Sequence, residues 1–344
     1  MAAPAGTAAI PHGDMAEILP SLPLEIRCPP FPLRRYKGFW LPEAVLTELA
    51  SIHARIQPRT SDIFLASFPK SGTTWLKALA FATANRARHR PSDVDHPLRH
   101  MNPHQCVKFM EMDLDLRRRD VSSLLEEFEA LGSLPPRLLA THLPYCLLPE
   151  SFTRESRLVY ICRNPKDVLV SDWFFVRKVS SAYGVDARCF TLEEAFERFC
   201  DGRLYGGPHW KHVLQYWEES MRRPQHVMFL EYEKMVRDPG GGLKKLAEFM
   251  GCGFSSEEEK GGVVEAIVKL CSLRELKNQG VNKSGGNSNQ AGGIKNEAFF
   301  RKGDIGDWRN HLTPAMANRL DKIVEDALQG SGFTFQEDIS TTID

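Results

Sequence analysis

The sequence of 344 residues predicts an α/β fold: a single domain with a central, mainly parallel sheet flanked by helices. Four short apolar runs lack polar alternation and are flanked by polar residues or proline, which is typical of strands buried on both faces. They occupy 63–66, 137–141, 158–161 and 227–230. Helical patterns lie between them, and this alternation favours an open parallel sheet. Because ligands bind such sheets at the carboxyl ends of the strands, the residues after each run are candidates for a site.

Three helices are predicted from local signals. After the first apolar run, the spacing i, i+3, i+4, i+7 predicts a helix whose inner face carries Leu76, Leu79, Ala80 and Thr83. Thr191 and Glu194 form a capping-box pattern before an aromatic-rich segment. Thr313 followed by Pro314 indicates an N-cap and a first helical position, which predicts a helix near the C-terminal end.

The chain divides into two parts by composition. Residues 1–35 are rich in Ala, Pro and Gly, and we expect them to form a mobile N-terminal arm whose last part lies on the surface of the domain. No internal repeat and no linker is visible after this point. The remainder, 36–340, is therefore predicted to fold as one domain.

Composition narrows the class of function. Lys plus Arg and Asp plus Glu number 44 each, so a global field that attracts nucleic acid or anionic membranes is not expected. The eight cysteines form no CxxC pair, which favours a reducing compartment. The sequence shows neither a secretory leader nor an apolar run long enough to cross a bilayer. We expect a soluble, cytoplasmic protein with no nucleic-acid or membrane partner, and a local cationic pocket stays compatible with these numbers.

The first apolar run leads directly into a predicted anion site. A strand, a turn containing glycine and a helix N-terminus follow one another, and the free N–H groups and dipole of such a helix favour negative charge. The arrangement resembles a P-loop, but the lysine precedes the glycine and the loop is shorter. The residues concerned are Lys70, Ser71, Gly72, Thr73, Thr74 and Trp75.

Two further segments carry cations in positions suited to an anion. Arg163 follows the third run and can bind a phosphate through two hydrogen bonds, with Ser171 about two turns later. Near the other end of the chain, Arg301 and Lys302 precede Gly303, which lets the backbone approach a ligand closely. Each of these short patterns is common by itself, so they gain weight only in combination with the first loop.

In combination, the segments resemble the cytosolic sulfotransferase family. The string Phe-Pro-Lys-Ser-Gly-Thr-Thr-Trp at 68–75 and the Arg-Lys-Gly at 301–303, with Asp307 and Trp308 after it, are similar to the two signature regions of that family. The resemblance spans about residues 35 to 335 and is strongest to the plant branch. It implies a P-loop-like sulfotransferase fold and an enzyme of class EC 2.8.2.-.

The resemblance also implies a reaction and its co-substrate. The family transfers a sulfuryl group from 3′-phosphoadenosine 5′-phosphosulfate (PAPS) to a hydroxyl of a small organic acceptor, without a metal. For the plant branch the acceptor is a phenolic, flavonoid, steroid or hydroxy acid, and the sequence does not distinguish among flavonols, brassinosteroids and hydroxyjasmonates.

Roles for individual residues follow from the resemblance alone. Lys70 to Thr74 are expected to hold the 5′ phosphosulfate end, and Trp75 to lie against the adenine. Leu273 departs from the animal pattern, which has Phe, and it can cover a purine without aromatic stacking. The other nucleotide-binding positions are Arg163, Ser171, Tyr232, Ser272, Arg301, Lys302 and Gly303.

The expected catalytic residues are His142 and Lys70. His142 lies in a Thr-His-Leu-Pro string directly after the second apolar run, where the family has its catalytic His. An imidazole with an ordinary pKa of about 6.5 can act as a general base at cytosolic pH. We expect Lys70 to neutralise charge on the leaving group. Phe109, Tyr145 and Phe175 lie beside motif residues and are candidates for the acceptor pocket.

Several alternatives stay open on the sequence. A P-loop small-molecule kinase would need Mg²⁺ ligands and a Lys after the Gly, and a catalytically silent nucleotide-binding protein would retain the same loops. The histidines at 96, 100 and 104 are spaced by four, but Pro97 and Pro103 interrupt the helix that would align them, so we predict no metal site.

Two expectations concern assembly and movement. Animal members of the family dimerise through a motif whose counterpart here, 309–318, departs from the pattern, so a monomer is favoured over a dimer. The stretch 284–293 is rich in Gly, Asn and Ser and is either a gate that orders around the nucleotide or a surface insertion.

Overall fold

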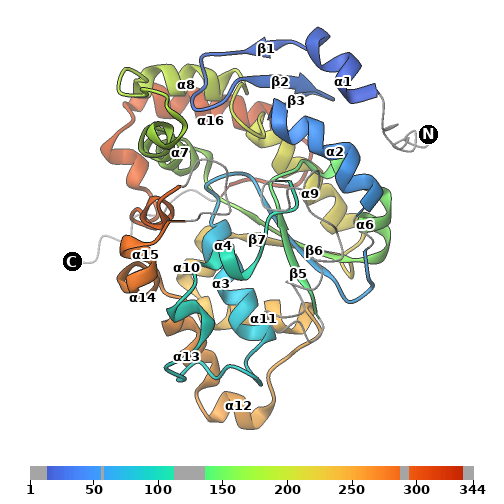
Figure 1. The fold of residues 1–344 in the computed structure, drawn as a ribbon, viewed down its shortest axis with the longest axis vertical. Coiled ribbons are helices and arrows are strands. Elements are labelled where there is room, and N and C mark those ends of the chain that lie inside the picture. Colours follow the sequence, from blue (N-terminus) through green and yellow to red (C-terminus); the bar gives the residue numbers. More distant parts are fainter. Residues whose placement is uncertain (1–13, 56–57, 112–135, 287–293, 336–344) are drawn as a thin grey trace.

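The computed structural model describes residues 14–55, 58–111, 136–286 and 294–335, and a four-stranded parallel sheet lies at its centre (Figure 1). The strand order is β5-β4-β6-β7, and all neighbouring pairs are parallel. The strands are β4 (Ile63–Ser67), β5 (Leu138–Thr141), β6 (Arg157–Cys162) and β7 (Val227–Glu231). They coincide with the four apolar runs, so the predicted α/β class with a mainly parallel sheet is confirmed.

Burial on both faces explains why these strands are apolar without alternation. In β4, Phe64 and Ala66 pack into one core cluster, whereas Ile63 and Leu65 pack into the other. Leu65 pairs in register with residues of β5 and of β6, so β4 lies in the interior of the sheet. The carboxyl ends of all four strands therefore meet at one edge.

Helices cover both faces of the sheet (Figure 1). One face is covered mainly by α3 (Thr73–Ala84), α10 (Tyr232–Arg237), α11 (Pro239–Phe249), α13 (Val263–Leu270) and α14 (Leu273–Asn278). The other packs against α2 (Glu43–Arg55), α6 (Glu150–Glu155), α7 (Pro165–Val179), α8 (Leu192–Cys200), α9 (His209–Arg222) and α16 (Pro314–Leu328). Shorter helices are α1 (Asp14–Ile18), α4 (Pro103–Cys106), α12 (Ser256–Lys260) and α15 (Gly280–Ser284).

The predicted helix starts are confirmed by their caps. The Thr191 side chain accepts a hydrogen bond from the Glu194 amide at 3.2 Å, and the Glu194 carboxylate accepts one from the Thr191 amide, so α8 begins with a capping box. The Thr313 hydroxyl accepts from the Met316 amide at 3.2 Å, and α16 begins at the following proline.

The described part of the N-terminal segment packs on the domain. Strands β1 (Leu24–Glu25), β2 (Leu33–Tyr36) and β3 (Phe39–Pro42) form an antiparallel sheet, and Met15, Cys28 and Leu33 are buried in the core. Residues 14–35 thus differ from a free arm, because these apolar side chains have a surface to cover. The boundaries predicted at 35 and 340 stay predictions, since 1–13 and 336–344 lie outside the described residues.

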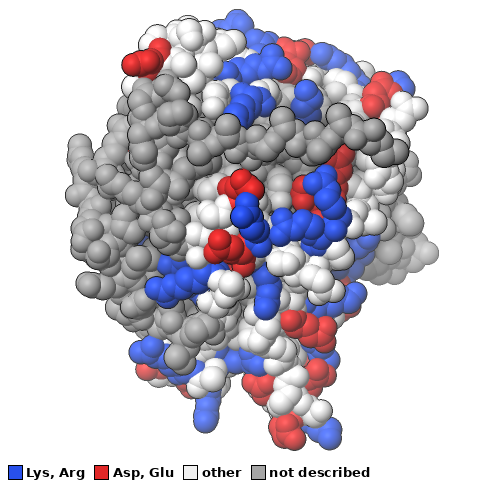
Figure 2. Space-filling view, turned by 90° about the vertical axis from the view of Figure 1, so that its right-hand side faces the viewer, with Lys and Arg blue, Asp and Glu red and all other residues white. Residues whose placement is uncertain are grey.

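Surface charge is mixed on the face shown in Figure 2, where Lys and Arg lie among Asp and Glu. Of the helices that the structure describes, none combines the length and the apolar character needed to cross a bilayer. All eight cysteines carry free thiols.

A buried ion pair joins the starting ends of the strands. Arg137, directly before β5, donates to the Asp62 carboxylate from Nε at 3.0 Å and from Nη2 at 2.5 Å. The Asp62 side chain is 0% exposed, and its carbonyl accepts from the Arg157 amide of β6. The pair thus fixes the ends of three neighbouring strands.

Removing one partner leaves a buried charge without compensation. We expect Arg137→Met to lower the free energy of unfolding by about 3–5 kcal/mol, measured by urea denaturation. Arg154→Ala, which removes an exposed i,i+4 partner of Glu150, is the control and should cost less than about 1 kcal/mol. Equal losses in the two variants would contradict this account of the pair.

Candidate functional site

A cavity of about 1630 Å³ opens at the carboxyl edge of the parallel sheet. Each strand supplies one side chain that lines it: Lys70 after β4, His142 after β5, Arg163 after β6 and Tyr232 after β7. Their convergence follows from the parallel direction of the strands, which brings all four carboxyl ends to one edge.

The loop between β4 and α3 depends on Gly72. Its φ is +104°, and an added Cβ would lie 2.7 Å from Cδ2 of Tyr232, so both the backbone angle and the space favour glycine. Lys70 also has a positive φ, of 68°. The loop packs closely against Tyr232 at the start of α10, and the first N–H groups of α3 follow directly after it at the cavity. The Ser71 hydroxyl is buried, and no described residue hydrogen-bonds to it.

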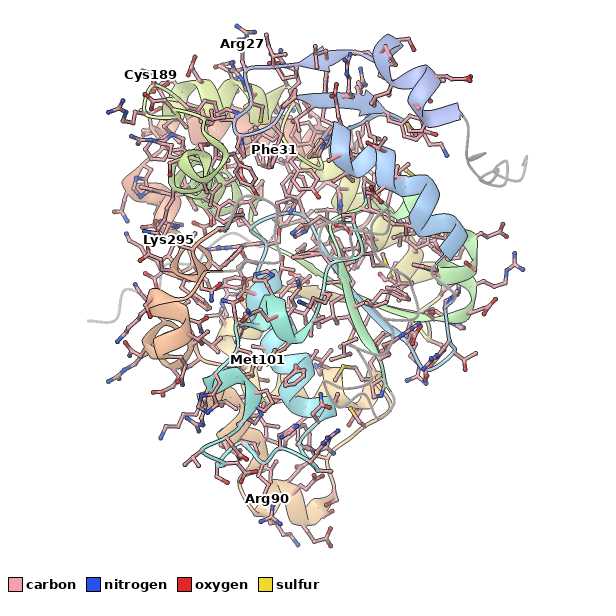
Figure 3. The ribbon with its side chains drawn as sticks, in the orientation of Figure 1. Arg27, Phe31, Arg90, Met101, Cys189 and Lys295 are labelled. Carbon is pink, nitrogen blue, oxygen red and sulfur yellow. The ribbon has the colours of Figure 1, made fainter. Side chains whose placement is uncertain are left out.

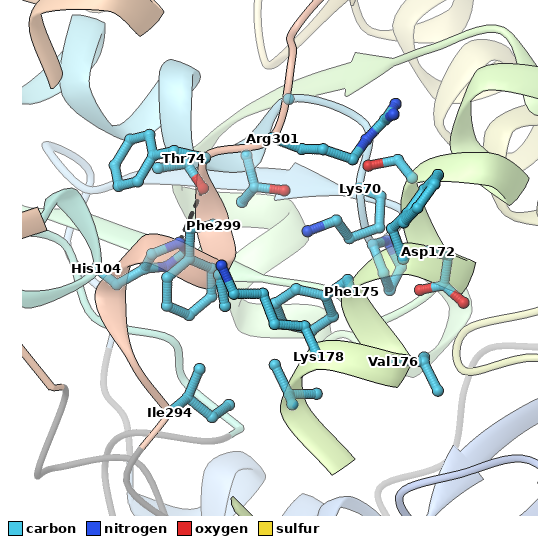
Figure 4. Close-up of a pocket in the computed structure, with 18 of the residues that line it drawn as sticks. Lys70, Thr74, His104, Asp172, Phe175, Val176, Lys178, Ile294, Phe299 and Arg301 are labelled. Atoms are coloured by element: carbon cyan, nitrogen blue, oxygen red, sulfur yellow. Dashed lines mark hydrogen bonds between the residues drawn. The ribbon is translucent and has the colours of Figure 1, made fainter. Parts of the chain in front are cut away.

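The Lys70 ammonium lies over an aromatic ring inside the cavity (Figure 4). Its Nζ is 3.7 Å from the ring centroid of Phe175. Burial lowers the pKa of Lys70 to about 7; Asp172 opposes this shift, and the cations of Arg163 and Arg301 add to it. The amine therefore carries less than a full charge at neutral pH in the empty cavity, and an anion beside it would restore the proton.

Arg163 and Tyr232 connect the loop that contains Gly303 and Asp304 to the carboxyl ends of β6 and β7. The Arg163 guanidinium lies 4.5 Å from the ring centroid of Tyr232, and its Nη2 donates to the Asp304 carbonyl at 2.7 Å. The Tyr232 hydroxyl donates to the carbonyl of Gly303 at 2.6 Å. Gly303 has a φ of +75°, and a Cβ there would lie 2.6 Å from Leu273, so the close approach requires glycine.

Arg301 and Lys302 share one carboxylate. Asp307 accepts from Nη1 of Arg301 at 2.5 Å and from Nζ of Lys302 at 2.6 Å. Burial by itself would raise the pKa of Asp307, but these hydrogen bonds hold it well below its usual range. Nε of Arg301 is buried without a partner among the described residues, and the same holds for Nε of Arg163. Two guanidinium donors thus remain available at this end of the cavity.

The geometry of His142 fixes its tautomer. Its Nδ1 lies 2.8 Å from the carbonyl oxygen of Ser67, which can only accept, so Nδ1 carries the proton and Nε2 keeps its lone pair. Burial, together with the charges of Lys77 and Lys70, lowers the pKa of His142 to about 3 although the Ser67 bond opposes the shift. The imidazole is therefore neutral at physiological pH and is able to accept a proton at Nε2.

Most of the residues predicted from the sequence line this one cavity. These are Lys70, Gly72, Thr73, Thr74, Trp75, Phe109, His142, Arg163, Ser171, Phe175, Tyr232, Ser272, Arg301, Lys302 and Gly303. Ser71, in the loop between β4 and α3, is buried and does not line the cavity. Tyr145 also lies elsewhere: its ring packs on Tyr216, with 5.5 Å between the centroids, in the core. Of the stretch 284–293, the part 287–293 lies outside the described residues.

The hydrogen bonds of His104 to two residues of α3, Thr74 and Lys77, were not predicted from the sequence. His104 Nε2 lies 2.9 Å from the Thr74 hydroxyl, and its Nδ1 lies 3.0 Å from Nζ of Lys77. Because the Lys77 ammonium can only donate, Nδ1 accepts, Nε2 carries the proton, and the Thr74 hydroxyl keeps its own proton to donate. The spacing by four drew attention to His104, but His96 bonds the Leu98 amide and His100 the Val94 carbonyl.

Comparison with known proteins gives consistent matches. The family model described as Sulfotransferase domain matches residues 60–332. Cytosolic sulfotransferase 8 of Arabidopsis thaliana is 42% identical over 320 residues, which cover 93% of this chain and 92% of that protein. The crystal structure of an Arabidopsis thaliana sulphotransferase is similar with a TM-score of 0.69 and 34% identity over 93% of this chain and 94% of that one. Mouse sulfotransferase SULT7A1 complexed with PAP (3′-phosphoadenosine 5′-phosphate) is similar with a TM-score of 0.63 and 26% identity, over 87% of this chain and 95% of that one.

Gly72 offers a direct test of how the loop is built. We expect Gly72→Ala to lower the free energy of unfolding by about 1–3 kcal/mol, because Ala is strained at this φ and its Cβ meets Tyr232. Gly240→Ala in α11 is the matched control: its φ is not positive, and a Cβ there meets only Val264 at 3.9 Å. That variant should be neutral or slightly stabilising in the same denaturation experiment, since Ala favours helix. A neutral Gly72→Ala would contradict the close packing described above.

Proposed function

Because the chain belongs to the Sulfotransferase domain family and is a sulfuryl transferase, we propose that PAPS is its donor and a small hydroxylated molecule its acceptor. The observation that carries the proposal is one cavity that holds Lys70, Arg163 and Arg301 together with His142. Because the chain belongs to the sulfotransferase family, we do not pursue the alternative of a small-molecule kinase. A catalytically silent member would bind the nucleotide without turnover of any acceptor, and measurement of both quantities distinguishes it from an active enzyme.

The residues present fit a doubly phosphorylated nucleotide. Buried donors of Ser71, Arg163 and Arg301 lack partners among the described residues, and such groups are costly unless a ligand satisfies them. Lys70 and the start of α3 would hold the 5′ end, with the Thr74 hydroxyl oriented by His104 to donate. Arg163, Ser171, Arg301, Lys302 and Gly303 would hold the 3′-phosphate, and Trp75 would cover the adenine, with Tyr232 and Ser272 beside it.

The same cavity supplies a base and a cation for the reaction. PAPS, when bound, provides a sulfuryl group joined to a phosphate, which is a good leaving group. His142 would remove the proton of the acceptor hydroxyl through its unprotonated Nε2. Lys70 would neutralise charge close to the nucleotide phosphates. Phe109, 4.6 Å from the His142 ring, and Phe175 would give the acceptor an apolar contact on either side.

The names of relatives and the sequence support a proposal for the cellular compartment and the oligomeric state. Relatives such as cytosolic sulfotransferase 8 carry the compartment in their name, and free thiols suit the cytoplasm. We retain the expectation of a monomer from the sequence at 309–318. Light scattering of the purified protein tests it.

Turnover of His142→Ala tests the base. With PAPS and a panel of phenols and alcohols, we expect kcat to fall by about 10²–10⁴-fold while the Kd for PAP changes less than about threefold. His100→Ala, which removes a histidine outside the cavity lining, is the control and should keep the wild-type rate. Wild-type rates in His142→Ala would remove this residue from the reaction. PAP binding by the wild type without turnover of any acceptor would favour the catalytically silent alternative.

The lowered pKa of Lys70 predicts proton uptake when the nucleotide binds. At pH 8.5 an amine with a pKa of about 7 is mostly neutral, and an adjacent phosphate raises this pKa, so binding should take up close to one proton. At pH 6 the amine is already charged and uptake should vanish. Calorimetry of PAP binding in buffers of different ionisation enthalpy measures this quantity.

The proton should be assigned to Lys70 by substitution. Lys70→Met is expected to abolish the uptake at pH 8.5, because it removes the amine whose pKa burial lowers to about 7. Lys322→Met, on the exposed side of α16, should leave it unchanged. Uptake that persists in Lys70→Met would show that another group takes the proton.

A further inference from the structure

The lining of the cavity carries carboxyl groups as well as cations. The cations assigned to the nucleotide are Lys70, Arg163, Arg301 and Lys302. The carboxyl groups come from Glu48, Glu111 and Asp172, and apolar side chains of the N-terminal segment such as Phe31 (Figure 3) line the same cavity. The lining therefore offers acidic groups to an acceptor, although the family reaction requires only an apolar pocket and a base.

Asp172 is placed to contact an acceptor. It follows Ser171 in α7, lines the cavity and lies near Lys70 and Phe175 in Figure 4. Among the described residues none donates a hydrogen bond to its carboxylate, and Lys70 interacts with it only electrostatically. Burial raises the pKa of Asp172 to about 6, and Lys70 opposes that shift, so the carboxylate is ionised at neutral pH.

A second unsatisfied carboxyl lies beside the base. Glu111 is 4% exposed; its Oε1 accepts from the His142 amide at 2.5 Å, whereas Oε2 is buried without a described partner. The Tyr205 hydroxyl likewise lacks a described partner, and its ring lies 6.0 Å from that of His142. Electrostatic interactions connect Tyr205 with Glu111, and Cys28 with Asp172. These groups can accept hydrogen bonds from a ligand, and unsatisfied buried groups favour one that donates.

Three further cations of the lining have other partners. Lys178 pairs with Glu297 at 3.2 Å, and Arg188 pairs with Asp186 at 2.8 Å; all four of these side chains are exposed. Arg177 is exposed and stacks on Trp173 at 4.9 Å. Solvent screens these exposed charges, so the buried cation that opposes Asp172 is Lys70, which the nucleotide would engage.

We infer that the preferred acceptor carries, beside the hydroxyl that receives the sulfuryl group, a protonated amine that Asp172 binds. An acceptor with a carboxylate in that place is rejected by like charge. The inference rests on the proposed function, since it assumes transfer to a hydroxyl beside His142. It makes Asp172 a residue that determines specificity, and it predicts that hydroxy acids are poor acceptors.

The test uses three phenols of one shape and different charge. Tyramine, 4-propylphenol and 4-hydroxyphenylacetate each present one phenolic hydroxyl and a short para chain that ends in an ammonium, a methyl or a carboxylate. For the wild type with PAPS, we expect kcat/KM for tyramine to exceed that for 4-hydroxyphenylacetate by at least 100-fold. Equal values, or a preference for the carboxylate, would overturn the inference without any variant.

Asp172→Asn then assigns the preference to this residue. The ratio of kcat/KM for tyramine to that for 4-propylphenol should fall at least tenfold, and the ratio for 4-hydroxyphenylacetate to 4-propylphenol should rise at least tenfold. A change in the rate of sulfuryl transfer that does not depend on the charge of the acceptor cancels in these ratios. Asp326→Asn, an exposed carboxylate on α16, should leave both ratios unchanged.

The outcomes separate this inference from the proposed function. Sulfation of 4-propylphenol with ratios that Asp172→Asn does not change would overturn the inference and leave the proposed function standing. Sulfation of other alcohols but not of tyramine would do the same. Absence of turnover with every acceptor would instead contradict the proposed function. Asp172→Ser, judged by PAP binding and thermal unfolding, replaces the Asn variant if that one does not fold, and the same ratios apply.

Discussion

The site depends on how its cations are kept buried and yet available. Lys70 lies over Phe175 and Arg163 over Tyr232, and Phe174 lies 5.1 Å from the Arg301 guanidinium. An aromatic face attracts a cation without cancelling its charge, as a buried carboxylate would. The desolvation cost then appears in the lowered pKa of Lys70, and an anionic nucleotide can relieve it. Where a carboxylate is used, as with Asp307, it is shared by two cations and leaves Nε of Arg301 free to donate.

The sheet and the loop between β4 and α3 could be predicted from the sequence because both follow from local rules. Strands such as 63–66 are buried on both faces and read as continuous apolar runs, and the loop from Ser67 to Trp75 joins such a strand to a helix start. The placement of His142 came from the resemblance to the family, and its tautomer required the position of the Ser67 carbonyl. Roles for individual nucleotide-binding residues remain proposals, although the structure gathers them around one cavity.

Other features depend on tertiary contacts that no local pattern encodes. Tyr145 is adjacent to the Thr-His-Leu-Pro string, yet the turn at 145–147 directs its ring onto Tyr216 in the core. His104 and Thr74 are 30 residues apart in sequence and meet only because α4 packs against α3. Residues 14–35 look like a tail by composition, but 28–31 and Leu33 line the cavity, where the ring of Phe31 lies 4.5 Å from that of Tyr183. Proline and glycine content describes the freedom of an isolated segment, and it does not describe the surface that this segment finds in the fold.

The hydrogen bond from Tyr232 to Gly303 has a consequence for biosynthesis. The binding cavity is completed by a loop close to the C-terminal end, and α16 then packs across α7, α8 and α9. A chain emerging from the ribosome can assemble β4 to β7 long before Arg301 and Lys302 leave the exit tunnel. During translation the nascent protein therefore holds Lys70 and Arg163 without the segment that closes over them. Affinity for the nucleotide should arise only at release, and fragments that end before residue 301 should neither capture the cellular nucleotide pool nor compete with the finished enzyme.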